Sequence, residues 1–89
     1  MEFIVQPDRI FMQDESDKLI AEVTFPGYDN VVTINHTFVD ESLRGQGIAE
    51  KLMEAVAQKL RHEHKKAILT CSYAIKWFET HAEYADILK

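Results

Sequence analysis

The segment VVTINHTFVDESLRGQGIAEKLMEAVAQKLRHEHKKAILTC, residues 31–71, contains the two changes of hydrophobic period that decide the fold. Polar and apolar residues alternate over 31–39, which predicts a β-strand. Apolar residues then return about every four positions, which predicts an amphipathic helix over about 47–62. The largely apolar run 67–71 is typical of a strand covered on both faces. The face of the first strand that we expect to be buried carries Val32, Ile34, His36 and Phe38.

These three elements predict a β-α-β unit, whose two strands should be parallel and joined by a right-handed crossover. The helix then begins at the carboxyl edge of the first strand, and Cys71 ends the second strand at that same edge. His36 lies near the end of the first strand. Because ligands of open α/β sheets bind outside the carboxyl ends of the strands, we expect the functional site at this edge.

Shorter strands precede this unit. Residues 18–25 alternate, and the turn-forming segment 26–30 separates them from 31–39, which predicts an antiparallel hairpin. Residues 10–12 predict an earlier strand. We therefore expect an α+β fold with α/β-like character, in which short antiparallel strands lead into the β-α-β unit. A single domain over 1–89 is expected, because 89 residues, 46% of them hydrophobic, supply one modest core.

The composition excludes several classes of function. The 10 Lys and Arg residues against 15 Asp and Glu give a net charge of −5, which argues against a nucleic-acid partner. One cysteine can form neither an intramolecular disulfide nor a multi-cysteine zinc site, and we expect no metal. Apolar runs are far shorter than the ~20 residues of a membrane span, and the N-terminus lacks the pattern of a signal peptide. We expect a cytoplasmic protein with no membrane partner.

Two of the three glycines, Gly45 and Gly47, lie in the turn before the helix. Glycine allows backbone conformations that bring the main chain close to a ligand. The first N–H groups of a helix have no partner within it and carry partial positive charge, so a phosphate can bind to them. The turn matches neither the dinucleotide-binding fingerprint nor the P-loop. We interpret it as an anion site, against the alternative of an ordinary glycine-rich turn.

At this turn the sequence resembles a known family. Arg44-Gly45-Gln46-Gly47-Ile48-Ala49 fits the Q/R-x-x-G-x-G/A pyrophosphate-binding motif of the GNAT acyl-CoA-dependent N-acetyltransferases. Three further segments are similar to small, single-domain GNAT-like proteins, and the resemblance extends over about residues 10–88. These segments are Asn35-His36-Thr37-Phe38-Val39, Cys71-Ser72-Tyr73 and His81-Ala82-Glu83-Tyr84.

The resemblance implies a minimal GNAT-like fold and acetyl-CoA, or coenzyme A, as the co-substrate. It implies that the two parallel strands splay apart and that the pantetheine arm of the cofactor enters between them. The residues that it assigns to the pyrophosphate are Arg44, Gly45, Gln46, Gly47, Ile48 and Ala49. Those that it places along the rest of the cofactor are Phe38, Val39 and Tyr73.

Two residues at the expected edge could carry chemistry. A Cys71 thiolate could accept the acetyl group as a thioester and pass it to an amine, and His36 could remove the thiol proton. The alternatives are that Cys71 is a small buried hydrophobic residue and that His36 is a core imidazole. Tyr84 is a candidate acid for the departing CoA thiolate, as a tyrosine is in some GNAT enzymes.

The function that we predict is acetyl-CoA-dependent N-acetyl transfer from a small-molecule acyl donor to an amine that the sequence does not identify. We expect a monomer or a weak dimer. Larger relatives build much of the acceptor pocket from elements for which 89 residues leave no room. Two alternatives therefore stay open: a non-catalytic module that binds CoA or acyl-CoA, and an interaction domain with an incidental glycine turn.

Overall fold

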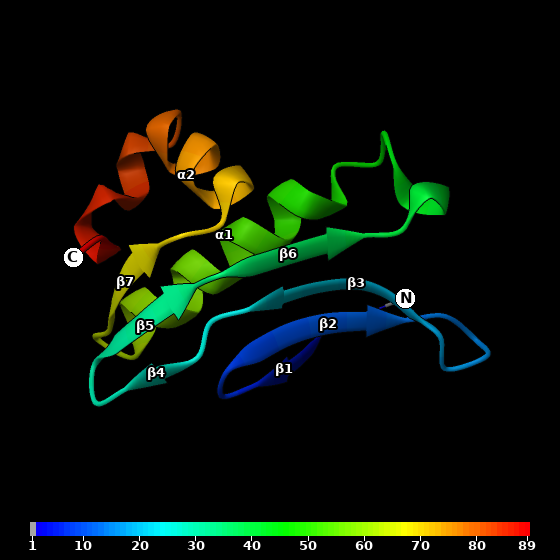
Figure 1. Ribbon diagram of the computed structural model, residues 1–89, viewed down its shortest axis with the longest axis horizontal. Coiled ribbons are helices and arrows are strands. Elements are labelled where there is room, and N and C mark those ends of the chain that lie inside the picture. Colours follow the sequence, from blue (N-terminus) through cyan, green and yellow to red (C-terminus); the bar gives the residue numbers. More distant parts are fainter. Residues whose placement is uncertain (1) are drawn as a thin grey trace.

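The computed structural model describes residues 2–89 and contains two small sheets, with α1 lying across the back of them (Figure 1). The first sheet is antiparallel and has the order β1 (Ile4–Gln6), β2 (Arg9–Gln13), β3 (Leu19–Thr24), β6 (His36–Val39). The second has the order β4 (Gly27–Tyr28), β5 (Val31–Ile34), β7 (Lys66–Leu69). The helices are α1 (Ile48–His62), α2 (Ser72–Glu79) and the 3-10 helices η1 (Glu41–Leu43) and η2 (Ala82–Ile87).

The predicted β-α-β unit is confirmed. Strands β5 and β7 pair in parallel from Val31↔Lys66 to Ile34↔Leu69. Helix α1 lies between these two strands in the chain. The predicted antiparallel hairpin is also present, because β6 pairs with β3 and β5 pairs with β4. Strand β1 was not expected from the sequence, since all three of its residues are exposed and carry no alternating pattern.

The prediction of one continuous strand over 31–39 is wrong, because β5 and β6 belong to different sheets. The break lies at Asn35. Its N–H donates to the Thr24 carbonyl at 3.2 Å, while the next residue, His36, is the register partner of the same Thr24. Two residues of one strand thus oppose one residue of its neighbour, which is the pattern of a β-bulge. The alternation of side chains therefore shifts by one residue at this point.

The bulge reverses the predicted faces of β6. Thr37 lies opposite Val23, whose side chain is in the core, so Thr37 faces the side of the sheet that α1 covers. His36 lies opposite Thr24, is itself exposed, and points to the side of the sheet that α1 does not cover. We call this uncovered side of β2, β3 and β6 the outer face. The prediction that His36 is buried beside Ile34 is wrong, because His36 is exposed on the outer face.

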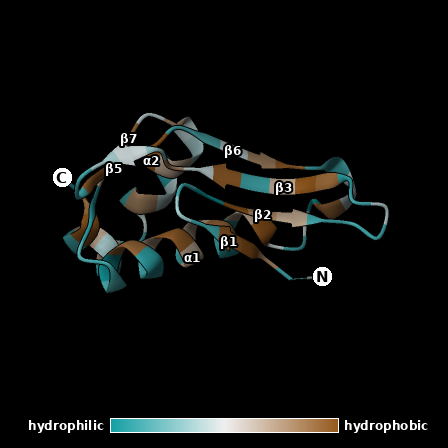
Figure 2. Cartoon of the chain, turned by 90° about the horizontal axis from the view of Figure 1, so that it is seen from below, coloured by the Kyte–Doolittle hydropathy of each residue, from teal (hydrophilic) through white to brown (hydrophobic). Residues whose placement is uncertain are grey.

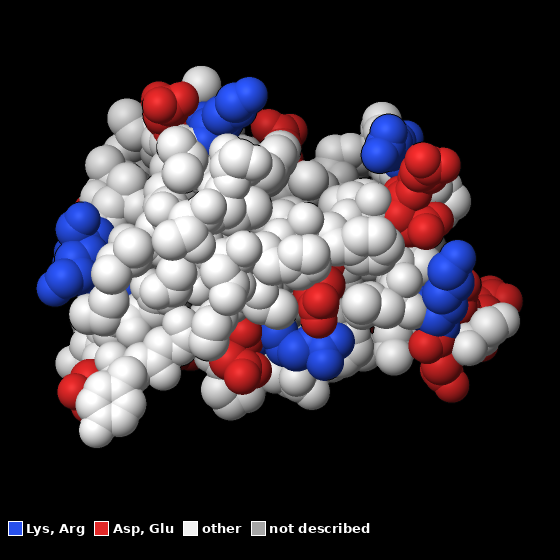
Figure 3. All heavy atoms as spheres, viewed as in Figure 1, with Lys and Arg blue, Asp and Glu red and all other residues white. Residues whose placement is uncertain are grey.

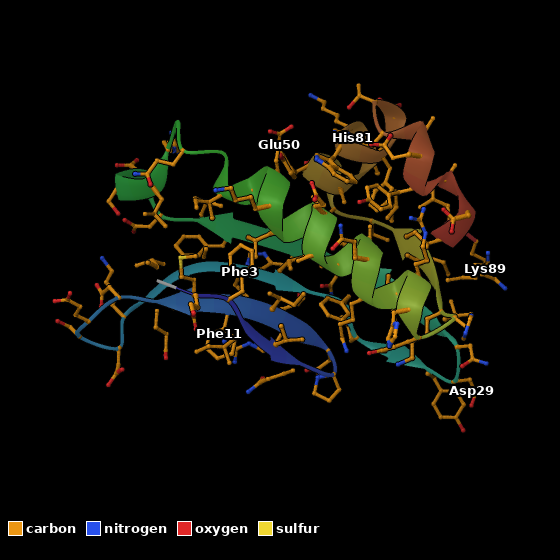
Figure 4. All side chains as sticks on the ribbon, turned by 180° about the vertical axis from the view of Figure 1, so that it is seen from behind. Phe3, Phe11, Asp29, Glu50, His81 and Lys89 are labelled. Carbon is orange, nitrogen blue, oxygen red and sulfur yellow. The ribbon has the colours of Figure 1, made fainter. Side chains whose placement is uncertain are left out.

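The core lies between the sheets and α1. Figure 2 shows the apolar side of α1 turned toward the strands, and Figure 4 shows α1 crossing the sheet from behind. This geometry follows from the helical period, because residues three and four apart share one face. The fully buried residues of that face are Leu52, Met53, Val56, Ala57 and Leu60.

Strand β7 departs from its prediction in two ways. It is covered on one face only, since Ala67 is buried whereas Ile68 is 43% exposed. The strand also ends at Leu69, so Cys71 is not its last residue. Cys71 instead occupies the N-cap position of α2. The sulfur therefore sits at a strand-to-helix corner.

A tight contact at Gly27 holds β4 against β5 and gives a stability prediction. A Cβ atom there would lie 2.3 Å from the Val31 carbonyl oxygen and 2.6 Å from Val32 Cα. Both are backbone atoms, so Gly27→Ala is expected to lower the free energy of unfolding by about 1–3 kcal/mol, as measured by urea denaturation. Tyr28→Ala is the matched control, because Tyr28 is 84% exposed in the same strand and should change stability by less than about 0.5 kcal/mol. Equal stability of the two variants would contradict this account.

Candidate functional site

The site begins where β5 and β7 stop pairing. The Ile34 carbonyl oxygen accepts hydrogen bonds from the N–H groups of Thr70 and Cys71, both at 3.1 Å. Beyond this point the segment after β5 enters the first sheet as β6, while the segment after β7 turns into α2 (Figure 1). These two segments diverge, so the splayed strands that the resemblance implies are present. The opening lies between β6 and the start of α2.

The glycine turn closes one end of this opening. Gly45 and Gly47 have φ values of +82° and +71°, in the left-handed region that residues with a side chain rarely adopt. Gly47 is the N-cap of α1 and has no side chain, so no side-chain cap occupies the first N–H groups of the helix. These groups carry the positive end of the helix dipole. The turn can therefore accept an anion on its main chain.

A groove runs along the opening, and we call it the splay groove. Its first part is a cavity of about 230 Å³, and its second part is a cavity of about 340 Å³. Both parts are lined by Val39, Arg44, Ala49 and Tyr73. The first part is completed by Leu43, Gly45, Gly47, Ile48 and Glu50, and the second by Thr37 and Phe38.

The splay groove collects almost all of the residues that the resemblance assigns to a cofactor. The exception is Gln46, which does not line it and whose N–H donates to the Leu43 carbonyl at 3.3 Å. Phe38 alternates with Thr37 and Val39, so its side chain belongs to the outer face and its backbone borders the groove. The predicted residues are thus brought together by one turn, one strand and one helix start.

Glu50 and Tyr73 both line the first part of the groove, and sequence reasoning did not include Glu50 in the site. Figure 4 shows Glu50 between the first turn of α1 and α2. Burial raises the pKa of the Tyr73 phenol, and the Glu50 carboxylate raises that pKa further. Tyr73 is therefore held as a neutral phenol. The signal for Glu50 was its position in the first helical turn, where an acidic residue is ordinarily read as a partner of the helix dipole.

Cys71 is half-buried at the N-cap of α2 and lines neither cavity of the splay groove itself. Its Sγ is 3.5 Å from Thr37 Oγ1, with which it shares a hydrogen bond. Burial by itself would raise the pKa of the Cys71 thiol. The Thr37 hydroxyl and the N–H groups of Ala74 and Tyr73 outweigh burial, so the net pKa lies below its usual value. No side-chain cap bond of ordinary geometry joins Sγ to α2, so these N–H groups act on the sulfur as nearby dipoles.

The structure does not bring His36 to Cys71. Cys71 shares its hydrogen bond with Thr37, which faces the α1 side of β6, whereas His36 faces the outer side. The predicted removal of the thiol proton by His36 therefore lacks its geometry. Sequence reasoning missed Thr37, although the residue stood within the quoted segment Asn35–Val39. The bulge hid it, because unbroken alternation from Ile34 would have placed His36 on the core side instead.

Tyr84 is also separated from the groove. Its hydroxyl accepts a hydrogen bond from Gln58 Nε2 at 3.2 Å, and its ring stacks on Trp77. Gln58 comes ten residues after Ile48, which is about 15 Å along an α-helix. Tyr73 is thus the tyrosine that borders the splay groove. Within residues 2–89, no three His, Cys, Asp or Glu side chains gather closely enough to hold a metal, and no helix could cross a membrane.

The similarity of the chain to known proteins identifies its family. The family model described as GCN5-related N-acetyl-transferase matches residues 9–87. The chain belongs to this family. A GCN5-like protein of Staphylococcus aureus, described as a candidate N-acetyltransferase, has 31% sequence identity and a TM-score of 0.81, over 99% of this chain and 87% of its own. No curated protein matches the chain at a significant level.

Longer acetyltransferases share the fold. A GNAT family N-acetyltransferase from Escherichia coli, solved in complex with CoA, has a TM-score of 0.62 at 20% identity, over 85% of this chain and 43% of its own. The ribosomal-protein-S18-alanine N-acetyltransferase of the same organism has a TM-score of 0.66 at 15% identity, over 89% and 51%. The chain spans about half the length of these two proteins. Acetyl-CoA is the co-substrate of the family, and the chain is an N-acetyltransferase of the GNAT kind.

Proposed function

We propose that the chain transfers the acetyl group of acetyl-CoA to an amine and that Cys71 carries this group between the two. The observation that supports the proposal most directly is the position of the Cys71 sulfur. It lies half-buried at the opening between β6 and α2, beside Thr37 of the splay groove. A nucleophile at that position can meet a thioester that enters along the groove.

In this proposal the glycine turn binds the pyrophosphate of CoA. The first N–H groups of α1 donate to its oxygens, and Arg44 adds a positive charge at the same cavity. Local counter-charge is needed because the chain as a whole carries −5. The pantetheine arm then follows Val39 toward Thr37, with Tyr73 on the opposite wall.

The first half-reaction moves the acetyl group to the protein. The Cys71 thiol loses its proton to solvent, and the thiolate attacks the carbonyl carbon of acetyl-CoA. The new S–C bond to Cys71 forms, and the S–C bond to CoA breaks when the tetrahedral intermediate collapses. The departing CoA thiolate takes the proton of the Tyr73 hydroxyl, which solvent then restores. Exchange between two thioesters is nearly isoenergetic, so this step needs no external driving force.

The second half-reaction passes the acetyl group to the acceptor. A neutral amine attacks the Cys71 thioester, an N–C bond forms, and the Cys71 thiolate leaves. The amine nitrogen must give up a proton, and imidazole is the side chain best suited to take one near neutral pH. His36 does not take this proton, because it faces the outer side of β6 whereas the Cys71 thioester lies on the α1 side, beyond hydrogen-bond reach. In this proposal the amine proton therefore passes to solvent, as the proton of the Cys71 thiol does.

A second function, a module that binds acyl-CoA without transferring the group, has one observation in its favour. Among residues 2–89 no helix covers the outer face, which Figure 3 shows as an open surface and which carries the Arg9–Glu22 ion pair of β2 and β3. An enclosed acceptor pocket is therefore absent from the described part of the chain.

One assay separates the two functions. Acetyl-CoA is incubated with the protein and either a lysine-containing peptide or a small primary amine, and both free CoA thiol and acetylated amine are measured. The transferase predicts CoA release that depends on the amine, with a matching amount of acetylated product. Ligand-induced stabilisation by acetyl-CoA without amine-dependent CoA release would support the binding module instead.

A further inference from the structure

The Cys71–Thr37 contact joins two elements that are otherwise apart. Beyond the Ile34↔Leu69 pair, β6 and the chain that follows β7 share no strand pairing. Cys71 is tied to the 34–37 segment twice: its N–H donates to the Ile34 carbonyl at 3.1 Å, and its Sγ lies 3.5 Å from Thr37 Oγ1. The first bond fixes the backbone of Cys71 and the second fixes the direction of its side chain.

The bulge at Asn35 determines which residue makes the second bond. Asn35 and His36 share Thr24 as their partner, so the residue that follows them, Thr37, turns toward the α1 side. Strict alternation would have offered an imidazole to the sulfur. The fold offers a hydroxyl instead, and a hydroxyl is neutral in the whole range of physiological pH.

We propose that Thr37 is a positioning residue for Cys71, which it holds toward the splay groove by a hydrogen bond that persists in both protonation states of the sulfur. The proposal rests on the acetyl-transfer function given above. It assigns to Thr37 a role that acts through Cys71, with no contact to the acetyl group itself.

A threonine hydroxyl suits this role because it is both a donor and an acceptor and its proton can rotate. While Cys71 is a thiol, the S–H group donates to Thr37 Oγ1. When Cys71 becomes a thiolate, the Thr37 O–H donates to the sulfur, and the pair keeps its geometry. Valine has the same shape as threonine but can make neither bond. Serine keeps the hydroxyl and loses only the methyl group.

The charged side chains near Cys71 do not determine the pKa of its thiol. Arg44 and Glu50, of opposite charge, line the first part of the groove together with Tyr73. On β6, His36 faces away from the sulfur. No charged side chain contributes to the lowered pKa of Cys71, which Thr37 and main-chain N–H groups account for. Removal of one hydroxyl should therefore be measurable.

The test uses the single cysteine of the chain as its own reporter. The rate of Cys71 alkylation by iodoacetamide is measured against pH, because the thiolate is the reactive form. Thr37→Val is expected to move the midpoint of this profile to higher pH and to slow alkylation at pH 7 about threefold to tenfold. Thr37→Ser is expected to restore the wild-type profile. His36→Gln is expected to leave the profile in place.

Thr33→Val is the matched control, since Thr33 is a partly buried threonine of the adjoining β5 strand without a contact to Cys71. Thermal unfolding of each variant establishes that it is folded, and Thr37→Ala replaces Thr37→Val should the latter not fold. An unchanged midpoint in the folded Thr37 variant, or a failure of serine to restore it, overturns the proposal. Acetyl transfer that survives loss of Cys71 while the Thr37 shift persists overturns the covalent route and leaves the Thr37–Cys71 coupling standing.

In the acetyl-transfer assay, a positioning role has its own signature. Thr37→Val should lower kcat with little change in the KM for acetyl-CoA, because the pyrophosphate turn is untouched. A rise in KM with unchanged kcat would instead make Thr37 a contact of the cofactor, and would overturn the proposal.

Discussion

Gly47→Val is expected to abolish the stabilisation of the protein by acetyl-CoA. Gly47 has a φ of +71° at the N-cap of α1. A β-branched residue strongly disfavours that conformation, at a cost of about 1–2 kcal/mol, so the turn would shift to a different backbone path. The N–H groups that we assign to the pyrophosphate would then no longer point into the splay groove. The measurement is the melting temperature with and without acetyl-CoA.

The size of the expected effect follows from ligand linkage. Acetyl-CoA at about 100 times its Kd stabilises the wild-type protein by about 2.7 kcal/mol, which is about 10–20 °C in melting temperature for a domain of this size. In Gly47→Val this increase should be lost. The space around Gly47 is open, since a Cβ atom there would have no neighbouring atom within 4 Å, so a clash in the unliganded protein is not the cause. Conformation is the cause, and the variant should fold.

Glu41→Val provides the control, because it introduces the same side chain at an exposed position of η1, away from the groove lining. This variant should keep the full increase in melting temperature. If Gly47→Val also kept it, the glycine turn would not be the pyrophosphate site, and the assignment of residues 44–49 would fail as a set.

The local elements were predictable from the sequence because each buries one face, so its apolar residues recur at the spacing of a helix or of a strand. The four-residue repeat predicted a helix over about 47–62, and α1 spans Ile48–His62. Its five buried residues supply the stripe that the repeat describes. The parallel pairing of β5 with β7 followed from connectivity, since a helix joins them. Here local pattern and global fold agree.

The position of His36 could not be predicted because a bulge is a property of a pair of strands. Alternation within 31–39 contains no sign that Asn35 and His36 will share Thr24 as a partner. One extra residue reverses every side chain that follows it. The sequence predicted His36 as the partner of Cys71, and a pairing that only the structure reveals places Thr37 there instead.

The exposure of β7 escaped prediction for a related reason. A short apolar run is typical of a strand covered on both faces, yet Ile68 is 43% exposed. What covers a strand depends on elements distant in the sequence, and the described chain supplies a helix on one face only. The same absence leaves the outer face open, which is why the acceptor could be predicted less well than the cofactor.

Cys71→Ala is expected to remove both the acetyl-enzyme and most of the transferase activity. Incubation of the wild-type protein with acetyl-CoA, without an amine, should add one acetyl group by intact-mass spectrometry, and hydroxylamine should remove it. The alanine variant should show no added group. Its rate of amine acetylation should fall at least about a hundredfold, because removal of a nucleophile eliminates the covalent route.

The dependence on pH gives this prediction a second readout. Because the pKa of Cys71 lies below its usual value, formation of the acetyl-enzyme should rise with pH through a midpoint below that of an unperturbed cysteine thiol. Below that midpoint the thiol predominates and the rate should fall tenfold per pH unit. Cys71→Ser is the structural control, since a hydroxyl can keep the N-cap position of α2 while staying protonated at neutral pH. Full activity in Cys71→Ala would contradict the covalent route and leave direct attack of the amine on acetyl-CoA, which still requires the splay groove.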